Sequence, residues 1–128
     1  KQVERLNIDN SVIFRGFSSN VKEEIRDSAM FVLSSDYEGI SNSMIEALSM
    51  GVPVISTDCP VGGSRMYIED GISGLLTPVG DRQALAEAMI RVADDPGFAR
   101  VLSANGVKST KRYGLQNIAD RFLQEAGI

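Results

Sequence analysis

Two short apolar runs with a helical pattern between them constrain the fold of this chain more than any other feature. The runs cover residues 30–33 and 52–56, and such short apolar runs are expected of strands buried in a parallel sheet. The apolar residues between them recur at helical spacing, at Met44, Ile45 and Leu48. Gly51 is well placed to end this helix in a left-handed conformation. The order strand, loop, helix, strand predicts a βαβ unit, whose ligand site lies where strand carboxyl ends meet helix amino ends.

Two glutamates, Glu38 and Glu46, lie eight residues apart around the expected start of this helix. On one continuous helix this spacing would separate them by about 80° around the axis and roughly 12 Å along it, so they would not share a face. With Glu38 in the loop and Glu46 in the first turn, they would instead flank the amino end of the helix. An anion between them would meet free backbone N–H groups and the positive end of the helix dipole.

Both glutamates also have structural interpretations, which the sequence leaves open. Ser41, Asn42 and Ser43 are all plausible caps of the helix. If Ser43 is the cap, residues 43–46 fit a capping box, in which Glu46 accepts a hydrogen bond from the backbone N–H of Ser43. Glu38 is equally compatible with a solvated loop acid.

The same stretch resembles the signature of the group 1 (family 4) retaining glycosyltransferases. The resemblance is carried by residues 38–42, 46–48 and 51–55, which hold two glutamates with seven residues between them and then Gly-x-Pro-Val. It continues through residues 58–65 and 71–78, and so covers most of the chain in order. It implies that residues 1–128 form the nucleotide-sugar (donor) binding domain, the carboxyl-terminal half of a two-domain GT-B enzyme.

The predicted fold class is α/β, a Rossmann-like three-layer α/β/α arrangement with a parallel sheet. Four strands are visible in the sequence, at residues 11–14, 30–33, 52–56 and 73–77. The resemblance implies six strands in the order 3-2-1-4-5-6, so we expect the first strands of this domain and the amino-terminal acceptor domain to be absent. We expect the strand at residues 11–14 to close against the one at residues 30–33, or a second copy of the chain to cover the exposed edge.

Three helical patterns follow the last predicted strand, and we expect them to serve packing. Asp81 is expected to cap the first, Pro96 to open the second, and the third covers residues 115–126. Their apolar residues are Leu85, Ala88, Met89 and Val92 in the first, Phe98, Val101, Leu102 and Val107 in the second, and Ile118, Phe122 and Leu123 in the third.

The resemblance implies transfer of a sugar from a nucleotide-diphosphate sugar with retention of anomeric configuration. It makes Glu46 the acceptor of hydrogen bonds from the ribose hydroxyls, a role that suits the two oxygens of a carboxylate. It makes Glu38 the catalytic-site acid that contacts hydroxyls of the donor sugar. The segment Gly39, Ile40, Ser41 and Asn42 would offer backbone N–H groups to the sugar and the diphosphate.

The resemblance also implies that the loop containing Gly16 and Phe17 borders the base of the donor nucleotide. The alternative for Phe17 is a core residue that fills the space between a strand and a helix. Cys59 is expected to be a small buried residue near a strand end. The adjacent pair Gly62 and Gly63 indicates either a close backbone approach or a turn with positive φ.

Composition excludes several other classes of function. A net charge of −4 argues against nucleic acid as a partner. With no histidine and one cysteine, the chain offers no metal-ligand spacing and no Ser/His or Cys/His pair. We therefore expect no metal and no cofactor, the nucleotide-diphosphate sugar being a substrate.

The resemblance implies an acceptor, a saccharide or a lipid-linked saccharide, that is bound mainly by the amino-terminal domain. The chain has no signal-peptide pattern and no apolar run of membrane-spanning length, which favours a cytoplasmic protein. Contact with the inner face of a membrane is expected only through the amino-terminal domain.

A second class of function stays open at the level of the sequence. A non-catalytic nucleotide or phospho-ligand module, or an interaction domain, could share the Rossmann-like fold. Met66 stands where relatives commonly carry a glutamate, which favours this alternative mildly, whereas the two glutamates at family spacing argue against it. A dehydrogenase is disfavoured because the Gly-x-Gly-x-x-Gly fingerprint is absent.

Overall fold

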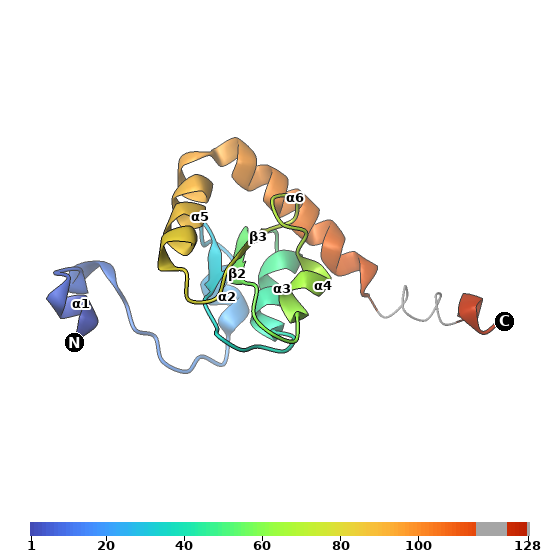
Figure 1. Ribbon diagram of the computed structural model, residues 1–128, viewed down its shortest axis with the longest axis horizontal. Helices are drawn as coiled ribbons and strands as arrows, with labels where there is room; N and C mark the ends of the chain where they lie inside the picture. Colours follow the sequence, from blue (N-terminus) through green and yellow to red (C-terminus); the bar gives the residue numbers. More distant parts are fainter. Residues whose placement is uncertain (115–122, 128) are drawn as a thin grey trace.

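A computed structural model describes residues 1–114 and 123–127 of the chain. Its centre is a parallel sheet in the order β1-β2-β3, formed by Phe31–Leu33, Val54–Thr57 and Leu75–Thr77 (Figure 1). All four residues of the middle strand, β2, are buried, which explains why the sequence there is apolar without alternation. The predicted α/β class with a parallel sheet is confirmed.

Helices cover both faces of this sheet, as Figure 1 shows. Val54 points into one core with Met44, Ala47 and Leu48 of α3 (Asn42–Ser49), whereas its neighbour Ile55 points into a second core. This second core contains Val92 of α5 (Arg82–Asp94) and Leu102 of α6 (Pro96–Arg112). Because successive side chains of a strand point to opposite faces, β2 joins the two cores in a three-layer α/β/α arrangement.

The remaining helices are short. They are α1 (Gln2–Arg5), the 3₁₀ turn η1 (Asp9–Ser11), α2 (Val21–Ile25) and α4 (Gly63–Tyr67). Figure 1 shows α1 at the end of an arm that extends away from the sheet, whereas α3 and α4 lie close to one another beside it. No helix in the described ranges is both long enough and apolar enough to cross a membrane.

The predicted strand at residues 11–14 is wrong. Ser11 closes the η1 turn, and the following residues form no strand and no pairing with β1, so the described part of the chain has three strands rather than four. Ile13 and Phe14 are 74% and 82% exposed. A β-strand forms only by hydrogen bonding to a neighbouring strand, and the described residues offer this segment no such neighbour.

The apolar faces of the carboxyl-terminal helices are narrower than their periodicity predicts. Val92 and Leu102 are buried as expected, but Met89 and Val101 are exposed. Each of α5 and α6 packs against the sheet with only a narrow row of side chains, and the opposite side of the helix faces solvent. The predicted third helix falls largely on residues 115–122, including Ile118 and Phe122, which lie outside the described residues; Leu123 is exposed rather than inward-facing.

Gly106 lies in the middle of α6, where a glycine weakens a helix by roughly 1 kcal/mol relative to alanine. Its position is explained by a close approach to α3. A Cβ atom at Gly106 would lie 3.0 Å from Cδ2 of Leu48 and 3.3 Å from the carbonyl oxygen of Ser73. The glycine therefore lets α6 pack closely against α3, the helix that carries the candidate site.

Candidate functional site

The site begins at the amino end of α3, at the carboxyl edge of the sheet. Ser41 is the cap: its backbone is extended, and its Oγ accepts a hydrogen bond from the N–H of Met44 at 3.3 Å. The N–H of Ile45 donates to the carbonyl oxygen of Ser41 at 3.1 Å. The first-turn amides of Asn42 and Ser43 precede any acceptor within the helix, so they are available to a ligand. Gly39 to Asn42 thus lead into a helix end whose free amides are of the kind that bind anions in other proteins.

The opposite end of α3 is closed as the sequence predicts. Gly51 has φ of 74°, the left-handed conformation, and its N–H donates to the carbonyl oxygen of Leu48 at 3.0 Å. The N–H of Val52 donates to the carbonyl oxygen of Ala47, also at 3.0 Å. This pair of bonds is the Schellman motif, and it fixes where β2 begins relative to the helix.

The capping-box interpretation of Glu46 is wrong. Because Ser41 caps α3, Ser43 is already the second residue of the helix and Glu46 lies in its second turn. The Glu46 carboxylate instead faces Lys22 of α2, with Oε1 3.8 Å from Nζ, and its side chain is 33% exposed. Glu46 is therefore held beside the helix, not at the cap, and keeps carboxylate surface for a ligand.

Glu38 lies in the loop between β1 and α3 and is half-buried. Its Oε2 accepts a hydrogen bond from Oγ of Ser35 at 3.3 Å. Its backbone carbonyl oxygen lies 3.9 Å from Sγ of Cys59, which is buried near the end of β2 as expected. The loop acid is thus partly ordered by its surroundings rather than freely solvated.

The structure gathers some predicted site residues and leaves others apart. Glu38 and the segment from Gly39 to Asn42 meet at the amino end of α3, with Glu46 in the second turn of the same helix. Gly16 and Phe17 lie in the exposed segment before α2, and Phe17 is 96% exposed. The interpretation of Phe17 as a core residue is therefore wrong, and its predicted place beside a nucleotide base stays a prediction.

Gly63, the first residue of α4, belongs to the site, although the sequence pattern did not indicate which segment it approaches. A Cβ atom there would lie 1.8 Å from the carbonyl oxygen of Gly39 and 3.1 Å from the nitrogen of Ile40. Its neighbour Gly62 has φ of 73°, so the glycine pair provides both the close approach and the positive-φ turn that the sequence offered as alternatives. Gly63 packs directly behind the segment that leads into α3.

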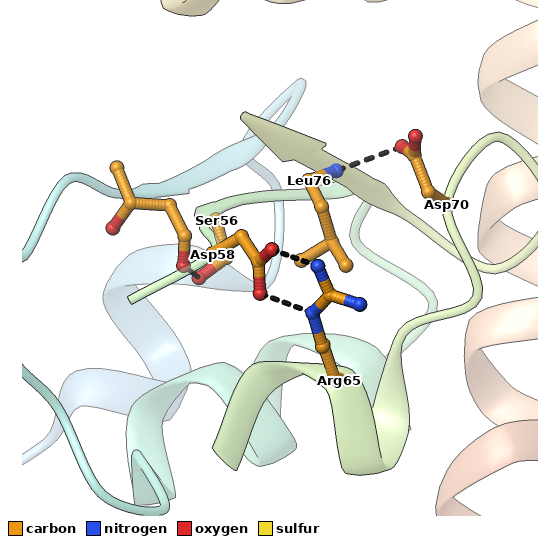
Figure 2. Close-up of polar contacts among 6 residues, drawn as sticks. Ser56, Asp58, Arg65, Asp70 and Leu76 are labelled. Carbon is orange, nitrogen blue, oxygen red and sulfur yellow. Dashed lines mark hydrogen bonds and ion pairs between the residues drawn. The ribbon is translucent and has the colours of Figure 1, made fainter. Parts of the chain in front are cut away.

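Asp58 and Arg65 form a second feature that the sequence did not reveal. Figure 2 shows the guanidinium of Arg65 on α4 pointing at the carboxylate of Asp58, which directly follows β2. Arg65 Nε donates to Asp58 Oδ1 at 2.5 Å, and Nη2 donates to Oδ2. The hydrogen bond from Arg65 holds the pKa of Asp58 below its usual value, so the pair is ionised at neutral pH.

Replacing Ser41 by alanine tests the assignment of the cap. We expect the free energy of unfolding to fall by about 1 kcal/mol, because the N–H of Met44 loses its hydrogen bond to the Oγ of Ser41. Replacing Ser43 by alanine is the matched control, and a much smaller change is expected because Ser43 is inside the helix. Urea unfolding of both variants provides the measurement; a larger loss for the Ser43 variant would restore the capping-box assignment.

Comparisons with known proteins point to one family. The model of a family described as Glycosyl transferases group 1 matches residues 1–95. An uncharacterized glycosyltransferase, MJ1059, from Methanocaldococcus jannaschii is 30% identical over 91% of this chain and 35% of its own length. The N-acetyl-alpha-D-glucosaminyl L-malate synthase of Bacillus anthracis is 36% identical over 77% of this chain and 25% of its own length.

Solved structures show the same fold. The Anabaena Alr3699/HepE structure, in complex with UDP, superposes with a TM-score of 0.86 at 23% identity, over 98% of this chain and 35% of that one. The chain spans about a third or less of the length of the first curated relatives it matches. These likenesses concern part of longer proteins.

Proposed function

Because the chain belongs to the group 1 glycosyl transferases, we propose that it is the donor-binding half of a glycosyltransferase. The enzyme transfers a sugar from a nucleotide-diphosphate sugar to an acceptor with retention of anomeric configuration. One observation carries the proposal: Glu38 and the segment from Gly39 to Asn42 lead into the amino end of α3, Glu46 lies in its second turn, and this end of the helix is at the carboxyl edge of a parallel sheet. This is where open α/β sheets bind their ligands.

In this proposal the diphosphate lies against the amino end of α3. The amides of Asn42 and Ser43 and the positive end of the helix dipole face it. Departure of the nucleotide builds negative charge on the diphosphate. A preorganised helix end stabilises that charge more in the transition state than in the ground state, which accelerates the reaction.

The two glutamates bind opposite ends of the donor. Glu46, one turn further along α3, accepts hydrogen bonds from the ribose hydroxyls, and its Oε1 lies 3.8 Å from Nζ of Lys22 on α2. Glu38, in the loop, accepts hydrogen bonds from hydroxyls of the transferred sugar. Gly16 and Phe17 contribute to the base side, where an exposed aromatic ring suits stacking on a base.

The proposed reaction requires no cofactor and no metal. The acceptor, a saccharide or lipid-linked saccharide, binds mainly to an amino-terminal domain, and contact with the inner face of a membrane is made through that domain in the cytoplasm. Anabaena HepE has been solved with UDP-glucose, and a relative from Bacillus subtilis is a poly(glycerol-phosphate) alpha-glucosyltransferase, which supports a nucleotide-sugar donor. We expect residues 1–128 alone to show negligible turnover, because the family resemblance assigns acceptor binding mainly to an amino-terminal domain.

Replacing Glu46 by glutamine in the full-length enzyme tests the ribose contact. We expect KM for the donor to rise about 10- to 150-fold with kcat changed little, because a hydrogen bond to a charged group is worth about 1.5–3 kcal/mol and the ribose does not react. Steady-state kinetics with a donor found by screening nucleotide sugars provide the measurement. The control is Glu23→Gln, an exposed acid on α2. An unchanged KM in the Glu46 variant would contradict the assignment.

The same assay separates the proposal from its rival. If the wild-type enzyme binds a nucleotide sugar but transfers nothing to any saccharide or lipid-linked acceptor, the non-catalytic module is the better description. Transfer that depends on Glu38 and Glu46 supports the enzyme.

A further inference from the structure

We propose that Asp58 and Arg65 are a positioning pair, which holds α4 so that Gly63 supports the backbone of Gly39 and Ile40 under the donor diphosphate. The effect on catalysis rests on the proposed function. The role of the pair in holding α4 is argued from the contacts of α4 alone. Neither residue is proposed to touch the donor.

The pair joins α4 to the sheet at a fixed point. Asp58 directly follows β2, and its N–H donates to the carbonyl oxygen of Thr77 in β3 at 2.8 Å. Its carboxylate is 24% exposed, whereas the Arg65 side chain is 68% exposed. A two-point contact between a guanidinium and a carboxylate fixes orientation as well as distance. Arg65 is therefore held in one direction relative to the strand ends.

A helix as short as α4 depends on such contacts. It has five residues, far fewer than an isolated helix needs for stability in water. One further contact between α4 and the sheet is buried: Oγ of Ser64 and Oγ of Ser56 on β2 lie 2.7 Å apart in a hydrogen bond. Ser64 and Arg65 are consecutive residues of α4, so the serine pair and the Arg65–Asp58 pair both join this helix to β2 and the residue that follows it.

The backbone of the loop before α4 is strained, which indicates that contacts of the folded chain hold α4 in its position. Val61 has φ of 78°, a left-handed conformation that is strained for a β-branched residue, and Gly62 follows with φ of 73°. Such strain persists only when the surrounding structure determines it. Here the loop is bounded by β2 on one side and by the fixed α4 on the other.

The consequence reaches the site through Gly63. Because no side chain separates Gly63 from the carbonyl oxygen of Gly39, any displacement of α4 is transmitted to the segment that enters α3. Loosening Arg65 should therefore make the amides of Gly39 to Asn42 more mobile, without removing any group that contacts substrate.

The test compares three variants of the full-length protein: Arg65→Gln, Arg65→Lys and the charge-swapped double variant Asp58→Arg/Arg65→Asp. Arg100→Gln on α6 is the matched control. Amide hydrogen exchange at Met44 and Ile45, whose N–H groups donate to Ser41 Oγ and to the carbonyl oxygen of Ser41, should become about three- to tenfold faster in the Gln and Lys variants and stay unchanged in the control. The lysine variant keeps the charge but loses the two-point contact. The charge-swapped double variant should restore part of the protection.

Kinetics then test the catalytic consequence. With the donor saturating, kcat should fall about threefold to tenfold in Arg65→Gln, in proportion to the lost protection, while KM for the acceptor stays constant. Wild-type exchange rates in all Arg65 variants would overturn the inference, whatever the activity. If the wild-type protein neither binds nor transfers any nucleotide sugar, the proposed function fails, while the exchange measurement still decides the role of the pair.

Discussion

Replacing Glu38 by glutamine is expected to lower kcat/KM for the donor by about 10- to 150-fold while the thermal unfolding midpoint stays within a degree or two of wild type. The loss follows from removing a charged acceptor of hydrogen bonds from the transferred sugar, worth about 1.5–3 kcal/mol. The small effect on stability follows because Glu38 is only half-buried and accepts one long side-chain bond, 3.3 Å from Ser35 Oγ.

Steady-state kinetics on the full-length enzyme, with unfolding followed by circular dichroism, make this measurement. Asp36→Asn is the control, since Asp36 is an exposed acid in the same loop. Because the sugar reacts and the ribose does not, the Glu38 variant should lose kcat as well as affinity, unlike the Glu46 variant. A Glu38 variant with unchanged kcat/KM would remove Glu38 from the donor site.

Replacing Gly63 by alanine is expected to damage both stability and donor binding. The new Cβ would lie 1.8 Å from the carbonyl oxygen of Gly39, so the backbone of one of the two segments must move. Inserting a methyl group into a packed contact costs about 1–3 kcal/mol, which corresponds to a fall of several degrees in the unfolding midpoint. Because the displaced segment enters α3, donor affinity should fall as well.

Gly62→Ala is the matched control for this variant. Gly62 has φ of 73°, but apart from Gly62 itself and its two chain neighbours, no atom of the described residues lies within 4 Å of the position that a Cβ would take there, so alanine adds backbone strain without a clash. Thermal unfolding and donor titration of both variants separate the two effects. If Gly63→Ala matched the wild type in stability and donor affinity, α4 would not support the Gly39 segment.

The sheet and the βαβ unit could be predicted because their signals are local. The apolar runs around Val32, Ile55 and Leu75 each became a strand, and Gly51 ended α3 as its position indicates. The run at residues 11–14 has the same appearance but no partner among the described residues. A strand forms only beside a neighbouring strand, and the sequence of residues 11–14 alone does not show whether that neighbour is present.

The placement of Glu38 and Glu46 around the start of α3 was predicted, but the contacts around them were not. The spacing of Glu38 and Glu46 indicated two acids around the amino end of α3. The sequence could not show that Ser41 rather than Ser43 is the cap, because three adjacent residues have side chains that can cap a helix. The cap is the one whose backbone is extended, and this is Ser41. The Asp58–Arg65 pair joins a strand end to a separate short helix, and its spacing matches no periodic pattern.

The central claim is that the donor diphosphate binds at the amino end of α3. A crystal structure of the full-length protein with the nucleoside diphosphate that most raises its unfolding midpoint tests this most directly, because a ligand that binds only the folded state stabilises it. We predict phosphate oxygens within hydrogen-bond distance of the amides of the segment from Gly39 to Ser43, and ribose hydroxyls on the carboxylate of Glu46. A diphosphate bound elsewhere, with Glu46 in contact only with Lys22, would contradict the claim.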